Sequence, residues 1–205
     1  MEYLVTMTTR VPAGTTDETV AAVRSREAAH SRDLVARGSL LRLWRPPLKP
    51  GEWRTLGLFS AEDDQELEKT LASMPLRIWR SDEVTPLAPH PNDPRPEQRA
   101  RRGSLNEFFT IFTIRIPAGA TPATVAEITS REAVRTRELA DRGALARLWL
   151  LPVVNEQTRA LGLWRASDEQ EMQQILDSLP MSGWMTVETI PLSRHPSDPP
   201  EASPS

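Results

Sequence analysis

The second half of the 205-residue sequence repeats the first half at a fixed offset of 105 positions. Leu40–Trp44 (LLRLW) aligns without a gap with Leu145–Trp149 (LARLW), and His90–Pro94 (HPNDP) aligns with His195–Pro199 (HPSDP). A repeat of this period constrains the fold strongly, because each copy has to form the same supersecondary unit. We therefore expect a tandem of two similar domains.

The domain boundaries follow from composition. We expect domains at residues 1–94 and 107–199, a linker at 95–106, and a disordered tail at 200–205. The linker sequence, RPEQRARRGSLN, is polar, basic and poor in apolar residues. A domain of about 100 residues buries roughly 60–65% of its unfolded surface, so each copy is large enough to have its own core.

Within each copy the pattern predicts the order strand, helix, strand, strand, helix, strand. In the first copy we expect strands at residues 3–11, 40–45, 54–59 and 82–87, and helices at residues 17–37 and 63–74. Thr16 can cap the first helix, and Gly38 suits the position after its end. This order is that of the α+β, ferredoxin-like fold. Because one such unit leaves one sheet face bare, two units can form a covalent pseudo-dimer.

Composition excludes several classes of protein. The net charge of −3 argues against a nucleic-acid-binding or membrane-surface protein. The absence of Cys removes disulfides, thiolate metal sites and cysteine nucleophiles. No apolar run approaches the roughly 20 residues of a membrane helix, and the first residues lack the pattern of a signal peptide. We expect a soluble, cytoplasmic protein with no nucleic-acid or membrane partner.

The most informative positions are Glu27 and its counterpart Glu132. Glu27 lies seven residues from both Val20 and Leu34, which places it near the middle of an apolar helix stripe. A carboxylate there is costly unless it is paired or has a raised pKa. A raised pKa suits a general acid or base, whereas pairing would make the residue a structural salt bridge. Both interpretations are open.

Two arginines are further candidates for functional residues. Arg42 and Trp44 share one strand face, as do Arg147 and Trp149, and such an arginine could clamp a carboxylate or pair with the buried glutamate.

His90 and His195 occupy the same His-Pro-x-Asp-Pro turn in the two copies. Each could shuttle protons or simply belong to a rigid turn that pins the C-terminal segment. His30, one turn after Glu27, is replaced by Arg135 in the second copy and is less central. The sequence has no metal-spaced cluster and no phosphate loop, so we expect no metal and no cofactor.

Both copies resemble the muconolactone isomerase family. The resemblance rests on Arg10-Val11-Pro12, Arg26-Glu27, Gly38–Arg45 (GSLLRLWR), Met74-Pro75-Leu76, and Val84–Leu87 leading into His90-Pro91. It implies a dimeric α+β barrel, formed here by two fused copies that assemble further into homo-oligomers. It also implies cofactor-independent transposition of a C=C bond by proton transfer in a small anionic lactone, as in aromatic catabolism.

By position, the resemblance assigns roles to both copies. The catalytic candidates are Glu27, Glu132, His30, His90 and His195. The substrate-binding candidates are Arg42, Trp44, Arg45, Arg147 and Trp149. Leu150 replaces Arg45 in the second copy, and we expect the charge of Arg135 to lower the pKa of Glu132. Glu27 should therefore be the stronger base.

Two other functions fit the same fold. One is a cofactor-free cyclase or monooxygenase of the ferredoxin-like barrel class in aromatic or polyketide metabolism. The other is a non-catalytic ligand-binding or assembly protein, in which the glutamates and arginines only hold an interface.

Overall fold

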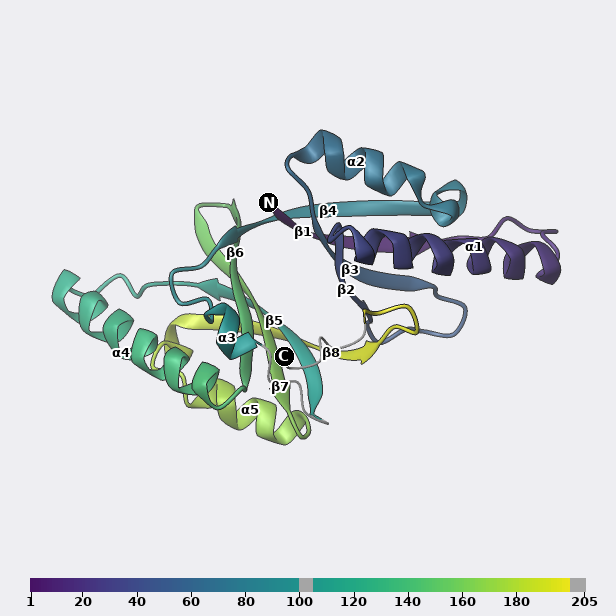
Figure 1. Ribbon diagram of the computed structural model, residues 1–205. Coiled ribbons are helices and arrows are strands. Elements are labelled where there is room, and N and C mark those ends of the chain that lie inside the picture. The colour runs from purple at the N-terminus through teal and green to yellow at the C-terminus, as the bar shows by residue number, and fades with distance from the viewer. Residues whose placement is uncertain (100–104, 200–205) are drawn as a thin grey trace. The chain divides into compact units, whose positions relative to one another are not determined.

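The computed structural model describes residues 1–99 and 105–199, which form two compact units (Figure 1). Unit 1 comprises residues 1–87 and 193–199, and unit 2 comprises residues 88–99 and 105–192. The units thus differ from the sequence repeats by an exchange of tails: each unit contains the His-Pro-x-Asp-Pro turn of the other repeat. The expected tail at 200–205 and part of the expected linker lie outside the described residues.

Unit 1 has the predicted βαββαβ order. Its elements are β1 (Glu2–Thr9), α1 (Asp17–Ala36), β2 (Leu40–Arg45), β3 (Arg54–Ser60), α2 (Asp64–Ser73), the short 3₁₀ helix η1 (Pro75–Trp79) and β4 (Arg80–Pro89), whose last two residues belong to unit 2. The Thr16 hydroxyl accepts a hydrogen bond from the Thr19 N–H, which confirms the predicted cap of α1. Gly38 ends α1 with a φ of +71°, a left-handed conformation that glycine adopts without strain.

The sheet of unit 1 is antiparallel, with the order β4–β1–β3–β2. Along β1 every second side chain is buried, as alternation in a strand requires. α1 and α2 pack on that face, and the core there includes Tyr3, Val5, Leu34, Leu67 and Leu71 (Figure 1). At the β2 edge, Ser193 and Arg194 pair with Arg45 and Trp44, which brings the exchanged tail beside β2.

Unit 2 repeats this architecture. Its elements are the one-turn helix α3 (Pro96–Arg99), β5 (Asn106–Ile114), α4 (Pro122–Asp141), β6 (Leu145–Val154), β7 (Gln157–Ala166), α5 (Glu169–Asp177), η2 (Ser182–Trp184) and β8 (Met185–Arg194), whose last two residues belong to unit 1. The strand order is β8–β5–β7–β6, and Ala88 and Pro89 pair with β6 as the exchanged tail of this unit.

The two units differ most between their second and third strands. In unit 2, β6 and β7 form a tight hairpin whose turn residues Asn155 and Glu156 both have positive φ. In unit 1, β2 stops at Arg45 before Pro46 and Pro47, and a longer loop leads to Trp53. No helix among the described residues is long and apolar enough to cross a membrane.

Candidate functional site

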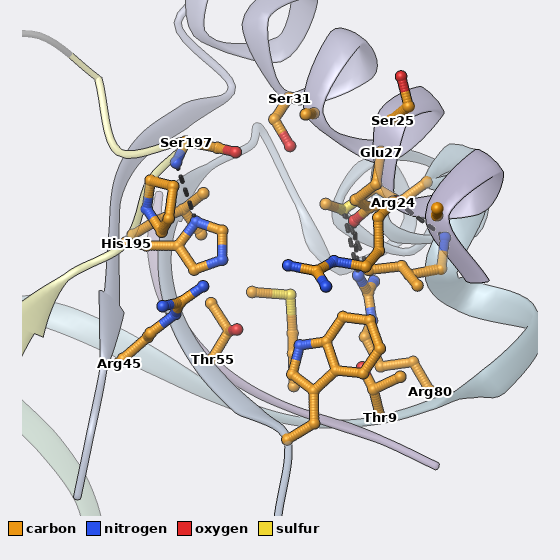
Figure 2. A pocket seen from close by; sticks show the side chains of 18 residues that line it. Thr9, Arg24, Ser25, Glu27, Ser31, Arg45, Thr55, Arg80, His195 and Ser197 are labelled. Atoms are coloured by element: carbon orange, nitrogen blue, oxygen red, sulfur yellow. Dashed lines mark hydrogen bonds and ion pairs between the residues drawn. The ribbon is translucent and has the colours of Figure 1, made fainter. Parts of the chain in front are cut away.

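A cavity of about 400 Å³ lies in unit 1 between α1 and the helix-covered face of the sheet (Figure 2). Its polar side chains come from elements far apart in the sequence. Arg24 and Glu27 project from α1, Arg45 from β2 and Arg80 from the start of β4, and the exchanged tail contributes His195. The tail therefore supplies part of the cavity wall.

Glu27 is held by two donors at one wall of the cavity. Its Oε2 accepts a hydrogen bond from the Leu76 N–H at 2.8 Å, and its Oε1 accepts from Arg80 Nη1 at 3.3 Å. The Arg80 side chain is 2% exposed and also binds Asp82, with 2.6 Å between Arg80 Nε and Asp82 Oδ1. Glu27 is thus paired, one of the two states expected for a carboxylate on this stripe.

Arg24 and Arg45 supply positive charge to the same cavity. The Arg24 guanidinium lies 5.4 Å from the ring centre of Trp53, a cation–π arrangement. Within residues 1–99 and 105–199, neither arginine forms an ion pair with a carboxylate. Figure 2 shows both side chains directed toward the interior, with Arg45 beside His195. Two such guanidinium groups suit the binding of an anionic ligand.

His195 enters the cavity as a neutral hydrogen-bond donor. Its Nδ1 accepts from the Ser197 N–H at 3.1 Å, so the proton of the neutral ring is on Nε2. Burial, together with the charges of Arg45 and Arg24, lowers the pKa of His195 to about 4, although Asp198 acts in the opposite direction. At neutral pH this ring can donate a hydrogen bond without carrying charge.

The structure places Arg42 and Trp44 outside the cavity. A bulge between Leu40 and Arg42 shifts the strand register, and Leu43 and Arg45 are the β2 residues that face the cavity. Arg42 instead binds Asp198, with 3.0 Å from Nε to Oδ1, and lies 4.6 Å from the ring centre of Trp44. The arginine proposed as an anion clamp from the sequence therefore pins the tail of unit 1.

The corresponding cavity of unit 2 has a volume of about 270 Å³ and includes Glu132 and His90. Glu132 Oε2 accepts from the Met181 N–H at 2.9 Å, and burial raises the pKa of Glu132 while this hydrogen bond opposes the rise. His90 Nδ1 accepts from the Asn92 N–H at 3.0 Å, and burial lowers the pKa of His90 against the effect of Asp93.

Arg147 and Trp149 repeat the arrangement seen in unit 1. Arg147 Nε lies 3.3 Å from Asp93 Oδ1, and the guanidinium lies 4.5 Å from the ring centre of Trp149. The Asp93 carboxylate also accepts from the Leu148 N–H at 2.7 Å. Neither Arg147 nor Trp149 lines the cavity of unit 2. Both His-Pro-x-Asp-Pro turns thus anchor the tail through Asp while their His residues line a cavity.

His30 and Arg135 lie outside the two cavities. His30 Nε2 is 2.8 Å from Ser73 Oγ, and Arg135 Nη2 is 2.9 Å from Ser178 Oγ, so each joins the long helix of its unit to the end of the short one. Arg135 also pairs with Glu138 at 2.9 Å. The expectation that Arg135 lowers the pKa of Glu132 is wrong, because burial dominates and raises that pKa. The pKa of Glu132 therefore does not support Glu27 as the stronger base.

Sequence reasoning missed the charged or aromatic residues Arg24, Trp53 and Arg80 of the unit 1 cavity. A signal for them was present in the repeat, because all three differ in kind from their counterparts in the second copy. Among the described residues, no group of three or more His, Asp or Glu side chains is arranged to hold a metal ion.

Comparison with known proteins places each repeat in one family. The family model described as muconolactone delta-isomerase matches residues 1–93 and 107–198. Muconolactone Delta-isomerase 1 of Acinetobacter lwoffii is 31% identical over 98 residues, which are 48% of this chain and 99% of that protein. Muconolactone Delta-isomerase of Cupriavidus pinatubonensis is 30% identical over 95 residues, 46% of this chain and 100% of that protein. One such relative therefore corresponds to one repeat.

Solved structures confirm the fold. Chlorite dismutase from Candidatus Nitrospira defluvii has a TM-score of 0.59 at 8% identity, with 96% of this chain and 92% of that chain covered. A heme-binding protein from Thermus thermophilus has a TM-score of 0.56 at 11% identity, with 96% and 93% covered. At such identities the similarity extends to the ferredoxin-like α+β architecture and no further.

Proposed function

The chain belongs to the muconolactone delta-isomerase family, and from this premise we propose that unit 1 isomerises a small lactone that carries a carboxylate. The proposed reaction moves a C=C bond by proton transfer and uses neither metal nor organic cofactor. The observation that supports it most is the composition of the unit 1 cavity. A carboxylate, two arginines without a carboxylate partner among the described residues, and a neutral histidine face one space.

Substrate binding is assigned to Arg24 and Arg45. Their guanidinium groups can form charge-assisted hydrogen bonds with the substrate carboxylate, and Trp53 holds Arg24 in place by stacking. Both arginines act on the pKa of His195, which indicates that their charges reach the same part of the cavity. An anion bound there would lie near the histidine donor.

We assign the chemistry to Glu27 and His195. The ion pair with Arg80 does not exclude this role of Glu27, because the same carboxylate also lines the cavity. Glu27 removes the proton from the carbon γ to the lactone carbonyl, and the electron pair moves toward the carbonyl oxygen. His195 Nε2–H, together with the arginine charges, stabilises the negative charge that develops on that oxygen. Glu27 then returns the proton to the α carbon. One C–H bond breaks, one forms, and the double bond moves from the α,β to the β,γ position, so no oxidant is consumed.

Steady-state kinetics on muconolactone test this proposal. Glu27→Gln should lower kcat by at least about 100-fold, within the usual effect of removing a general base. Glu132→Gln should cost distinctly less, because no arginine among the described residues lines the unit 2 cavity to bind the substrate carboxylate. Arg45→Leu, which installs the residue found in unit 2, should raise KM through the loss of a carboxylate contact.

Three results would contradict the proposal. Near-normal turnover by Glu27→Gln would make this glutamate structural. An unchanged KM in Arg45→Leu would remove the anion site. Oxygen uptake with the lactone would indicate a monooxygenase instead.

A further inference from the structure

The two cavities differ in charge although the repeats align without a gap. Every arginine of the unit 1 cavity has an uncharged counterpart 105 positions later: Thr129 for Arg24, Leu150 for Arg45 and Met185 for Arg80. Trp53, which stacks on Arg24, is replaced by Thr158, and Thr55 by Ala160. The glutamate on the helix and the histidine of the tail are retained. The substitutions therefore remove all three arginines and keep the glutamate and the histidine.

The unit 2 cavity is consequently lined mainly by apolar side chains. They include Phe112, Ile114, Val125, Leu148, Trp164 and Met185. Trp164 is fixed there by a hydrogen bond from its Nε1 to Thr110 Oγ1 at 2.8 Å. No Lys or Arg among the described residues lines this cavity. Its surface suits a small apolar molecule.

Glu132 disfavours the binding of anionic ligands in this cavity. Its carboxyl group has no cation partner among the described residues and receives one hydrogen bond, from the Met181 N–H. An anionic ligand would lose its hydration here and would also lie beside this carboxyl group, with no guanidinium to compensate. Burial already disfavours the charged form of Glu132 itself. Burial disfavours the charge of an anionic ligand in this cavity for the same reason.

The polar groups that remain indicate the ligand class. His90 Nδ1 is occupied by the Asn92 N–H, which leaves Nε2–H as a hydrogen-bond donor of the neutral ring. We propose that the unit 2 cavity is a second binding site, selective for an uncharged, largely apolar carbonyl compound whose oxygen accepts a hydrogen bond from His90. This site is independent of whether unit 1 is an isomerase.

Methionine methyl groups report on each cavity separately. Met7 and Met74 line the cavity of unit 1, and Met181 and Met185 line that of unit 2. The experiment is an NMR titration of the full chain, labelled with ¹³C at the methionine methyl groups. The two probes are muconolactone, which carries a carboxylate, and its uncharged methyl ester. Single Met→Leu variants assign the signals.

The methyl ester should shift Met181 and Met185, and muconolactone should need at least about tenfold higher concentrations to shift the same pair. The proposal is overturned if the ester leaves both signals unchanged, or if muconolactone shifts them at the same or lower concentration. The response of Met7 and Met74 to muconolactone tests the proposed function of unit 1, so the two failures can be distinguished.

Met185→Arg provides a matched variant, because it places in unit 2 the arginine that unit 1 has at position 80. A guanidinium beside Glu132 should abolish the shift of Met181 by the ester. The ligand-free signals of Met7 and Met74, unchanged from those of the wild type, report that the variant is folded. If the ester shifts Met181 in this variant as in the wild type, the apolar character of the cavity does not select the ligand and the proposal fails.

Discussion

Glu27 and Glu132 occupy equivalent helix positions but have different partners. Glu27 binds Arg80, whose side chain is 2% exposed, whereas methionine stands at the equivalent position beside Glu132. Each carboxyl group accepts a hydrogen bond from a backbone N–H: Glu27 from Leu76, and Glu132 from Met181. The partners of the two carboxyl groups therefore differ in one side chain, at the start of the following strand. In unit 1 this side chain pairs with Glu27, and in unit 2 the pKa of Glu132 is raised by burial.

This difference predicts opposite effects of two matched substitutions on stability. The folded-state pKa of Glu132 is raised above its ordinary value of 4.5, so its contribution to stability is full below pH 4.5 and is lost as the pH rises through the folded-state pKa. Glu132→Gln cannot ionise, so its Tm relative to wild type should increase between pH 4.5 and pH 8. Glu27→Gln should be less stable than wild type at pH 8, by about 1.5 kcal/mol for a lost charge-assisted hydrogen bond.

Thermal unfolding of the wild type and both variants across this pH range is the measurement. A Tm difference for Glu132→Gln that stays constant or falls with rising pH would show that Glu132 is not destabilised by burial in the folded chain.

For His195 we expect the dependence of stability on pH to have the opposite sign. Its folded-state pKa of about 4 lies below the ordinary value of 6.5, so the unfolded chain takes up this proton first as the pH falls. The wild type should lose stability from this group between pH 6.5 and pH 4. His195→Asn keeps an acceptor for the Ser197 N–H but cannot titrate, so its stability should depend less steeply on pH in this window. Parallel curves for the two proteins in denaturant titrations would contradict the assignment.

The exchanged tails are the elements that complete both cavities. In unit 1, Asp198 accepts the Leu43 N–H at 2.7 Å and binds Arg42, and the Asp198 side chain is fully buried. In unit 2, Asp93 makes the same contacts with Leu148 and Arg147, but the side chains of the ion pair are 10% and 15% exposed. The tails hold His195 and His90 at their cavities through these aspartates.

Asp198→Ala should therefore destabilise the protein more than Asp93→Ala. Breaking a buried ion pair by removal of one partner costs about 3–5 kcal/mol, because the other charge is left buried and uncompensated. Breaking the more exposed Arg147–Asp93 pair of unit 2 should cost less, since water can reach the remaining charge. Urea unfolding of the two single variants measures the difference. Equal losses, or a larger loss in Asp93→Ala, would mean that burial does not set the strength of these anchors.

The repeat, the element order, the cap of α1 and the glycine at its end were all predictable from the sequence, because each depends on local pattern. The tail exchange was not, because the two His-Pro-x-Asp-Pro turns are nearly identical and either could bind either strand. The cavity face of β2 was not predictable either: the bulge before Arg42 puts Arg45, and not Arg42, toward the cavity. Long-range pairing decided both outcomes.

At the scale of the whole molecule, fusion has allowed two equivalent cavities to diverge. A homodimer of single repeats would carry the same residues at both sites, whereas a tandem chain can change one cavity and keep the other. Here the cavity of unit 1 is cationic and that of unit 2 is apolar. Three expectations from the sequence stay predictions: the domain boundaries at 94 and 107, the pseudo-dimer and the homo-oligomer.

The central claim is that Glu27 of unit 1 transfers the proton that moves the double bond. The most direct measurement is the rate at which the full chain isomerises muconolactone carrying deuterium at the carbon γ to its carbonyl. The account predicts a primary isotope effect in the wild type and in Glu132→Gln, and conversion slower by at least about 100-fold in Glu27→Gln. Conversion by Glu27→Gln at the wild-type rate, with the same isotope effect, would contradict it.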